Sequence, residues 1–234
     1  MLKYKYILVF FVLQHSALAW ADLLVDESIV IYEHPSQSIY DVTVYNSDET
    51  ANLFLEVSPF EVARPGFETQ ELIPLSLNDS TDFLVSPNRA IIPPNSASLV
   101  RLLNLKNSGD SERVYRINLV PASPPAELAG DEDAVASLLQ VIVAYQVLVI
   151  ILPEEPRSEV EFDRSGNTLS FSNPGNANYL LSDGVQCDPT EPANCVYLQS
   201  RRIYPGNSWS IELPFDGPAQ YSVRNHEGRF DLEL

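Results

Sequence analysis

Residues 138–152 read LLQVIVAYQVLVIIL, and this run decides the fold class of the chain. It is rich in valine and isoleucine, whose branched Cβ atoms restrict χ1 and favour a pleated strand over a helix. A buried helix is the alternative for so apolar a run. We interpret it as a strand, which at about 3.3 Å per residue would extend for about 50 Å, far longer than an ordinary strand.

Both faces of this expected strand are apolar. Side-chain alternation places Leu139, Val141, Val143 and Tyr145 on one face. Such a strand is either central and fully buried in its own sheet, or it passes beyond the sheet and offers apolar side chains and unpaired backbone groups to another chain. We favour the second interpretation, which makes these four residues candidates for binding a partner.

Shorter runs with the same period of two indicate further strands, at residues 23–32, 38–45, 53–60, 97–105 and 114–120. The 18 prolines are spread along the chain and disfavour long helices. Residues 153–156 (PEEP) then interrupt the pattern, and a second alternating series starts near residue 159. The sequence predicts an all-β protein of two immunoglobulin-like sandwich domains, residues 22–153 and 154–234.

The first 21 residues have the pattern of a secretory signal peptide. Lys3 and Lys5 precede a short apolar run at residues 6–13, and small residues allow cleavage after Ala19 or Ala21. A transmembrane anchor is the alternative, but it needs about 20 apolar residues, and this run is less than half as long. We expect export to the periplasm and no stable insertion in a membrane.

Charge and cysteine content narrow the function classes. The chain has 32 Asp and Glu against 14 Lys and Arg, for a net charge of -18, which disfavours nucleic acid as a partner. Cys187 and Cys195 form an even pair in an expected exported chain, so a disulfide is the simplest interpretation. A zinc site would need two more ligands, and neither His34 nor His226 lies at ligand spacing.

Three further segments carry a family resemblance. Residues 86–102 (SPNRAIIPPNSASLVRL), residues 112–119 (ERVYRINL) and the Leu139-Gln140 pair that opens the long strand resemble the PapD-like periplasmic chaperones of the chaperone–usher pilus pathway. The resemblance is strongest over residues 86–153. In the second domain, residues 172–179 (SNPGNANY) and the cysteine pair look more like the alternative or archaic branches of that family.

The resemblance implies a boomerang of two domains that binds pilin subunits by donor-strand complementation and delivers them to an outer-membrane usher. In the P-pilus branch an arginine and a lysine anchor the subunit's terminal carboxylate, but the matching positions here are Ile29 and Leu148. We expect Arg116 as the anchor, with Arg101 second, because a guanidinium can hold a carboxylate bidentately. Either arginine could instead form a surface or interdomain salt bridge.

Other functions have less support in the sequence. No phosphate-binding loop, nucleophile elbow or histidine-based dyad is visible, so we expect neither an enzyme nor a cofactor. A secreted immunoglobulin-like adhesin or a fimbrial structural subunit is the alternative function. A subunit should begin with an alternating apolar extension, whereas the long apolar strand here lies in mid-sequence and a further domain follows it.

Overall fold

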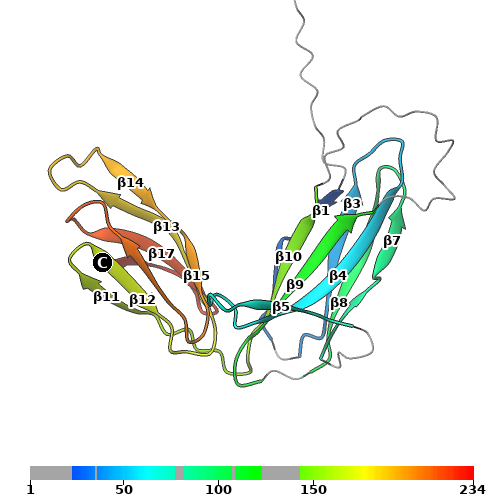
Figure 1. The fold of residues 1–234 in the computed structure, drawn as a ribbon, viewed down its shortest axis with the longest axis horizontal. Helices are drawn as coiled ribbons and strands as arrows, with labels where there is room; N and C mark the ends of the chain where they lie inside the picture. The colour runs from blue at the N-terminus through cyan, green and yellow to red at the C-terminus, as the bar shows by residue number, and fades with distance from the viewer. Residues whose placement is uncertain (1–22, 35, 77–81, 107–108, 123–142) are drawn as a thin grey trace, which may run out of the picture.

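The computed structural model describes residues 23–34, 36–76, 82–106, 109–122 and 143–234, and within these ranges all regular structure is β-strand. The expected signal peptide, Leu139 and Val141 lie outside the described residues. In the described part, no helix is long and apolar enough to cross a membrane. Two β-sandwiches follow one another along the chain, which confirms the predicted fold class (Figure 1).

Two facing sheets form the first sandwich. One has the strand order β1-β3-β8-β6, and the other has the order β2-β10-β9-β4-β5 with β7 also paired to β4. The bounds are β1 Leu23–Val25, β2 Ile29–Tyr32, β3 Ile39–Asn46, β4 Leu53–Ala63, β5 Glu71–Pro74, β6 Phe83–Ser86, β7 Arg89–Ile92, β8 Ser96–Asn104, β9 Arg113–Pro121 and β10 Tyr145–Ile151.

The single strand predicted at residues 23–32 is wrong, because the chain changes sheets within it. β1 pairs antiparallel with β3 in one sheet, whereas β2 pairs parallel with β10 in the other. Asp26 stabilises the crossing: its side chain accepts a hydrogen bond of 2.9 Å from the Thr43 backbone, and its backbone N–H donates to the Thr43 carbonyl at 3.1 Å. The switch places β2 beside the second half of β10.

The described part of the long apolar run is a strand of ordinary length. β10 begins at Tyr145, and Val143 and Ala144 precede it without regular structure. Val147, Val149 and Ile151 are buried in the core of the first sandwich, together with Tyr115, Ile117 and Leu119 of β9. The predicted alternation is therefore confirmed from residue 145 onward, and one face of β10 belongs to its own domain.

The second sandwich pairs a sheet of order β11-β12-β16 with a sheet of order β14-β13-β17-β18, and β15 also pairs with β13. The predicted disulfide is confirmed, because Cys187 and Cys195 are directly opposite partners on β13 and β14 and are bonded. The bounds are β11 Glu161–Ser165, β12 Thr168–Ser172, β13 Tyr179–Cys187, β14 Cys195–Leu198, β15 Arg201–Ile203, β16 Ser208–Glu212, β17 Ala219–Asn225 and β18 Gly228–Glu233.

The two sandwiches form the arms of a V and meet at its base (Figure 1). A small apolar cluster crosses the junction: Ile150 and Leu152 pack with Ala177 of the second sandwich, and Ile31 and Leu148 lie against them. The outer face of the β2–β10–β9–β4 sheet, turned away from its own core, therefore faces the second sandwich near the base of the V.

Candidate functional site

The first feature of the site is an incomplete edge of β10. β9 pairs with β10 from Tyr145 to Ile151, but β2 pairs with it only from Leu148 to Ile151. Before Leu148, β10 thus has a strand on one side only among the described residues. An open edge of this kind presents backbone N–H and C=O groups to which another strand can be added.

Four side chains lie in a row across the sheet at Leu148, the residue at which the pairing of β10 with β2 begins. Leu148 is directly opposite Ile29 on one side and Arg116 on the other, and Arg116 is opposite Phe60 of β4. Residues directly opposite on neighbouring strands point to the same face. The row therefore lies on the outer face of the sheet, with one cation among three apolar side chains. Ile29 is 45% exposed, so its apolar side chain is available to contact a partner beside β10.

Arg116 is half-buried and unpaired. Its β9 neighbours Tyr115 and Ile117 are buried in the core, so Arg116 points away from that core. Within the described ranges its side chain has no hydrogen bond and no ion pair. Its charge reaches the second sandwich, where it opposes the rise that burial causes in the pKa of Tyr204. A guanidinium in this position can donate hydrogen bonds to a carboxylate ligand.

Arg101 has a different environment. It lies on β8 in the opposite sheet of the first sandwich, and its Nε and Nη2 donate to the two oxygens of Asp41, both at 2.8 Å. The pair is at the surface, where hydrogen bonding to Arg101 lowers the pKa of the Asp41 carboxyl. The structure thus places the two predicted anchor residues on different sheets, and of the two only Arg116 lies on a strand that pairs with β10.

Of the four predicted partner-binding residues, the structure describes two. Val143 is 39% exposed and lies just before β10. Tyr145 is half-buried and packs against the core of its own sandwich, so only part of its ring surface is free to contact a partner. Gln146, on the other face, donates a hydrogen bond of 2.7 Å to Asn118 of β9.

A buried polar contact joins the two sandwiches beside this row. Glu112 Oε2 accepts hydrogen bonds from the Asn178 backbone at 2.9 Å and from the Asn178 side chain at 2.5 Å, while Oε1 is buried without a partner among the described residues. Arg202 in turn donates to the Asn178 side chain. Burial raises the pKa of the Glu112 carboxyl to about 7, although the hydrogen bonds from Asn178 and the charge of Arg202 act against this.

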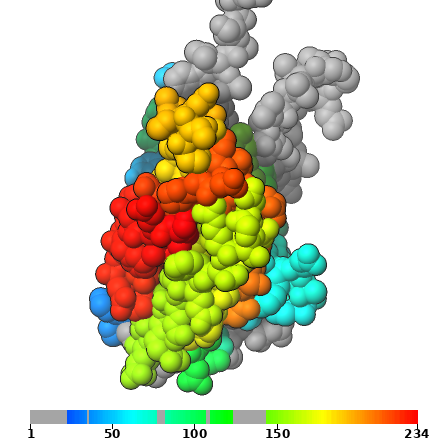
Figure 2. Space-filling model, turned by 90° about the vertical axis from the view of Figure 1, so that its left-hand side faces the viewer, coloured from blue at the N-terminus to red at the C-terminus, as the bar shows by residue number. Residues whose placement is uncertain are grey.

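A second contact comes from the turn between β4 and β5. The Pro65 carbonyl accepts a hydrogen bond of 2.6 Å from the Asn207 side chain. Gly66, at φ +80°, lies so close to the second sandwich that a Cβ there would be 2.5 Å from Asn207 Nδ2 and 2.9 Å from the Tyr204 ring. In Figure 2 this segment, in cyan, projects beside the second sandwich.

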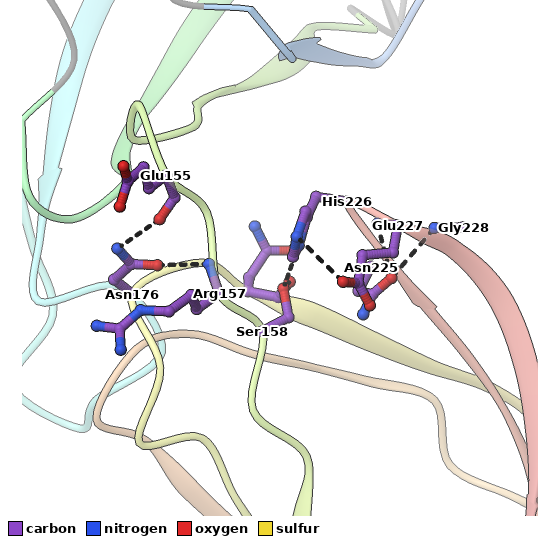
Figure 3. A network of polar contacts seen from close by, with 9 residues as sticks. Glu155, Arg157, Ser158, Asn176, Asn225, His226, Glu227 and Gly228 are labelled. Carbon is purple, nitrogen blue, oxygen red and sulfur yellow. Dashed lines mark hydrogen bonds and ion pairs between the residues drawn. The ribbon is translucent and has the colours of Figure 1, made fainter.

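The linker after β10 is fixed by polar contacts as well. Asn176 donates to the Glu155 carbonyl at 3.1 Å and accepts from the Arg157 backbone at 2.6 Å (Figure 3). It also donates to the Asp110 carbonyl at 2.9 Å. Ser158 lies 3.1 Å from Nδ1 of His226 in the β17–β18 turn. These contacts are not predictable from the sequence, because they join residues that lie far apart in the chain, and only the polar run at residues 172–179 marks part of the segment that makes them.

No family model and no curated protein matches the chain. Solved structures do match over nearly its whole length. A chain from the complex of the Salmonella enterica SafA pilin with the SafB chaperone has a TM-score of 0.64 at 17% identity, covering 93% of this chain and 99% of that one. The E. coli chaperone DraB gives 0.61 at 21% identity, covering 91% and 96%. The complex of CsuC with CsuE, from the archaic chaperone–usher Csu pili of Acinetobacter baumannii, gives 0.57 at 12% identity, covering 91% and 98%. The chain therefore has the two-domain fold of the fimbrial chaperones.

Proposed function

We propose that this protein is a periplasmic chaperone of the PapD-like family, which binds fimbrial subunits by donor-strand complementation and delivers them to an outer-membrane usher. The observation that carries the proposal is the open edge of β10 at Tyr145–Val147, with the unpaired Arg116 on the neighbouring strand β9, opposite Leu148. The fold shared with chaperones solved with a pilin or a tip adhesin supports the same conclusion.

The alternation of apolar residues along the run at 138–152 supports strand donation. Val147, Val149 and Ile151 occupy the core of the first sandwich. If residues 139–144 continue β10 when a subunit binds, Leu139, Val141 and Val143 fall on the same face as these core residues. They then enter the core of an incomplete subunit sandwich stacked end to end with the first one. Each fully buried side chain contributes roughly 1.5–3 kcal/mol.

Arg116 completes the site as the anchor for the subunit's terminal carboxylate. It replaces the arginine and lysine that the P-pilus branch uses, since Ile29 and Leu148 at those positions are apolar and lie in the same row across the sheet. A carboxylate bound at one fixed point sets the register of the added strand, while the backbone hydrogen bonds along β10 supply affinity that is independent of the subunit's sequence.

Co-expression with fimbrial subunits in the periplasm tests the proposal. We expect each cognate subunit to accumulate as a soluble complex with one copy of this chain and to aggregate without it, because an incomplete sandwich exposes an apolar groove. If subunits aggregate equally with and without the protein, the proposed function is wrong. The adhesin alternative predicts instead that the protein itself appears at the cell surface.

A further inference from the structure

The arginines of this acidic chain divide into paired and unpaired groups. Several of them have carboxylate partners, such as Arg64 with Glu71, Arg89 with Glu56 and Arg101 with Asp41. Within the part of the chain that the structure describes, three arginines have neither a hydrogen bond nor an ion pair from the side chain: Arg116, Arg201 and Arg224. Unpaired cations are unexpected where 32 acidic residues are available for 14 basic ones.

The unpaired arginines gather around one place, the half-buried pair of Arg202 and Tyr204. Arg202 of β15 and Arg224 of β17 are both directly opposite Leu180 of β13, so they lie on the same outward face. Burial lowers the pKa of Arg202, and the charge of Arg224 lowers it further. The charges of Arg116 and Arg201 both act on Tyr204. The cluster thus includes cations from both sandwiches.

Nearby acidic groups do not neutralise this cluster. Glu112 is engaged by Asn178, and burial raises the pKa of its carboxyl to about 7, so its charge is partly lost in neutral solution. Arg229 continues the row beyond Arg224 and does have a carboxylate partner, Asp183 at 3.1 Å. Within the described ranges, Arg116, Arg201 and Arg224 are therefore left without a carboxylate partner in a molecule of net charge -18.

We propose that Arg224 binds an acidic side chain of the client subunit, close to the terminal carboxylate that Arg116 holds, so that the chaperone selects clients with an acidic C-terminal segment. This inference rests on the proposed function and adds the chemical class of the client. A second copy of this chain fits the cluster less well, because two molecules of the same large negative charge repel each other. The two cations lie on different sandwiches, so such a client contacts both arms of the V.

Peptide binding tests the inference directly. The probes are fluorescent peptides of alternating apolar residues with a free C-terminal carboxylate, carrying a single Asp at each position near the C-terminus in turn, or Asn at the same position. Fluorescence anisotropy measures their affinity for the full mature chain. We expect one or two Asp positions to bind tighter than their Asn counterparts by about threefold to tenfold, an effect that falls with added salt.

Variants assign that preference to a residue. Arg224→Ala should abolish the preference for Asp over Asn, and Arg224→Lys should restore most of it. Arg89→Ala is the matched control, since it removes the same charge from an outer surface where Arg89 pairs with Glu56 at 2.9 Å, and it should keep the preference. Equal affinity of all Asp and Asn peptides, or an unchanged preference in Arg224→Ala, would overturn the inference.

Two further outcomes separate this inference from the proposed function. If the free carboxylate is required but Asp and Asn peptides bind alike, the anchor stands and the acidic client does not. If no peptide binds, the carboxylate anchor fails together with the inference. Sedimentation equilibrium tests the remaining alternative, in which Arg224 binds a second copy of this chain. If the wild-type chain self-associates and Arg224→Ala does not, that alternative is correct and the inference is wrong.

Discussion

The predicted role of Arg116 as the carboxylate anchor can be tested by a single substitution. The residue is half-buried and unpaired, so Arg116→Ala removes a cation without leaving a buried carboxylate behind. We expect affinity for a subunit with a free C-terminus to fall about tenfold, since a charge-assisted bidentate contact is lost, while the thermal midpoint stays unchanged. Arg101→Ala is the control, because it removes a surface partner of Asp41 on the opposite sheet and should leave affinity unaltered. Equal affinity in wild type and Arg116→Ala would remove Arg116 from the anchor role.

Glu112 makes the stability of the molecule depend on pH. Its pKa rises from 4.5 in the unfolded chain to about 7 in the fold, so the folded state holds the extra proton between these values. Stability from this group is complete below about pH 4.5 and is lost as pH rises through 7, by at most on the order of 3 kcal/mol. Glu112→Gln should flatten the decline in urea-unfolding free energy between pH 5 and pH 8. A parallel decline in both proteins would contradict this.

These two residues show what a sequence can predict at this scale. The outward position of Arg116 follows from strand alternation, because Tyr115 and Ile117 on either side are apolar. The role of Glu112 does not follow, because its partner Asn178 is 66 residues away in another domain. No periodic pattern encodes that contact.

At the scale of elements, we expect substitutions in the apolar run that includes β10 to cause the largest loss of subunit capture. Replacing Val141 and Val143 together by Asp should leave a folded protein that no longer keeps subunits soluble, because charges entering a dry subunit core are costly. Circular dichroism checks the fold, and the yield of soluble subunit measures capture. A matched control replaces two exposed apolar residues on the opposite sheet, Ile39 and Leu99, by Asp. Retained capture by the Val141 and Val143 variant would contradict strand donation.

The strands were predictable where apolar alternation persisted over a whole strand, as in β3, β8 and β9. The change of sheet between β1 and β2 was not, because alternation allows the polar residues 26–28 to be read as part of one strand, and the contact between Asp26 and Thr43 that marks the crossing joins distant residues. β5, β6 and β7 have four residues each, too few to show a period. The sequence predicted apolar residues on both faces of β10, and the two faces pack against different parts of the molecule. One face packs in the core of the first sandwich, and Ile150 on the other face packs at the domain junction.

At the scale of the whole molecule, the angle of the V is held by contacts from three separate segments. Glu112 reaches Asn178, Asn176 binds the linker and the Asp110 carbonyl, and the β4–β5 turn meets Asn207. Arg116 and Arg224 lie on different arms, so their separation depends on that angle. A change at the junction should therefore alter client binding without touching either arginine.

Gly66→Ala tests this dependence. The new Cβ would overlap Asn207 Nδ2 and the Tyr204 ring, so we expect the β4–β5 turn to move away from the second sandwich. Gly166→Ala is the matched control, because Gly166 also has a positive φ, +61°, but has nothing within 4 Å of the new Cβ. Both variants bear a similar backbone cost of about 1 kcal/mol. Only Gly66→Ala should widen the V, seen as a larger radius of gyration in small-angle X-ray scattering, and weaken binding of the acidic peptides. Identical scattering from the two variants would mean that the β4–β5 turn does not hold the angle, and that Glu112 and Asn176 suffice.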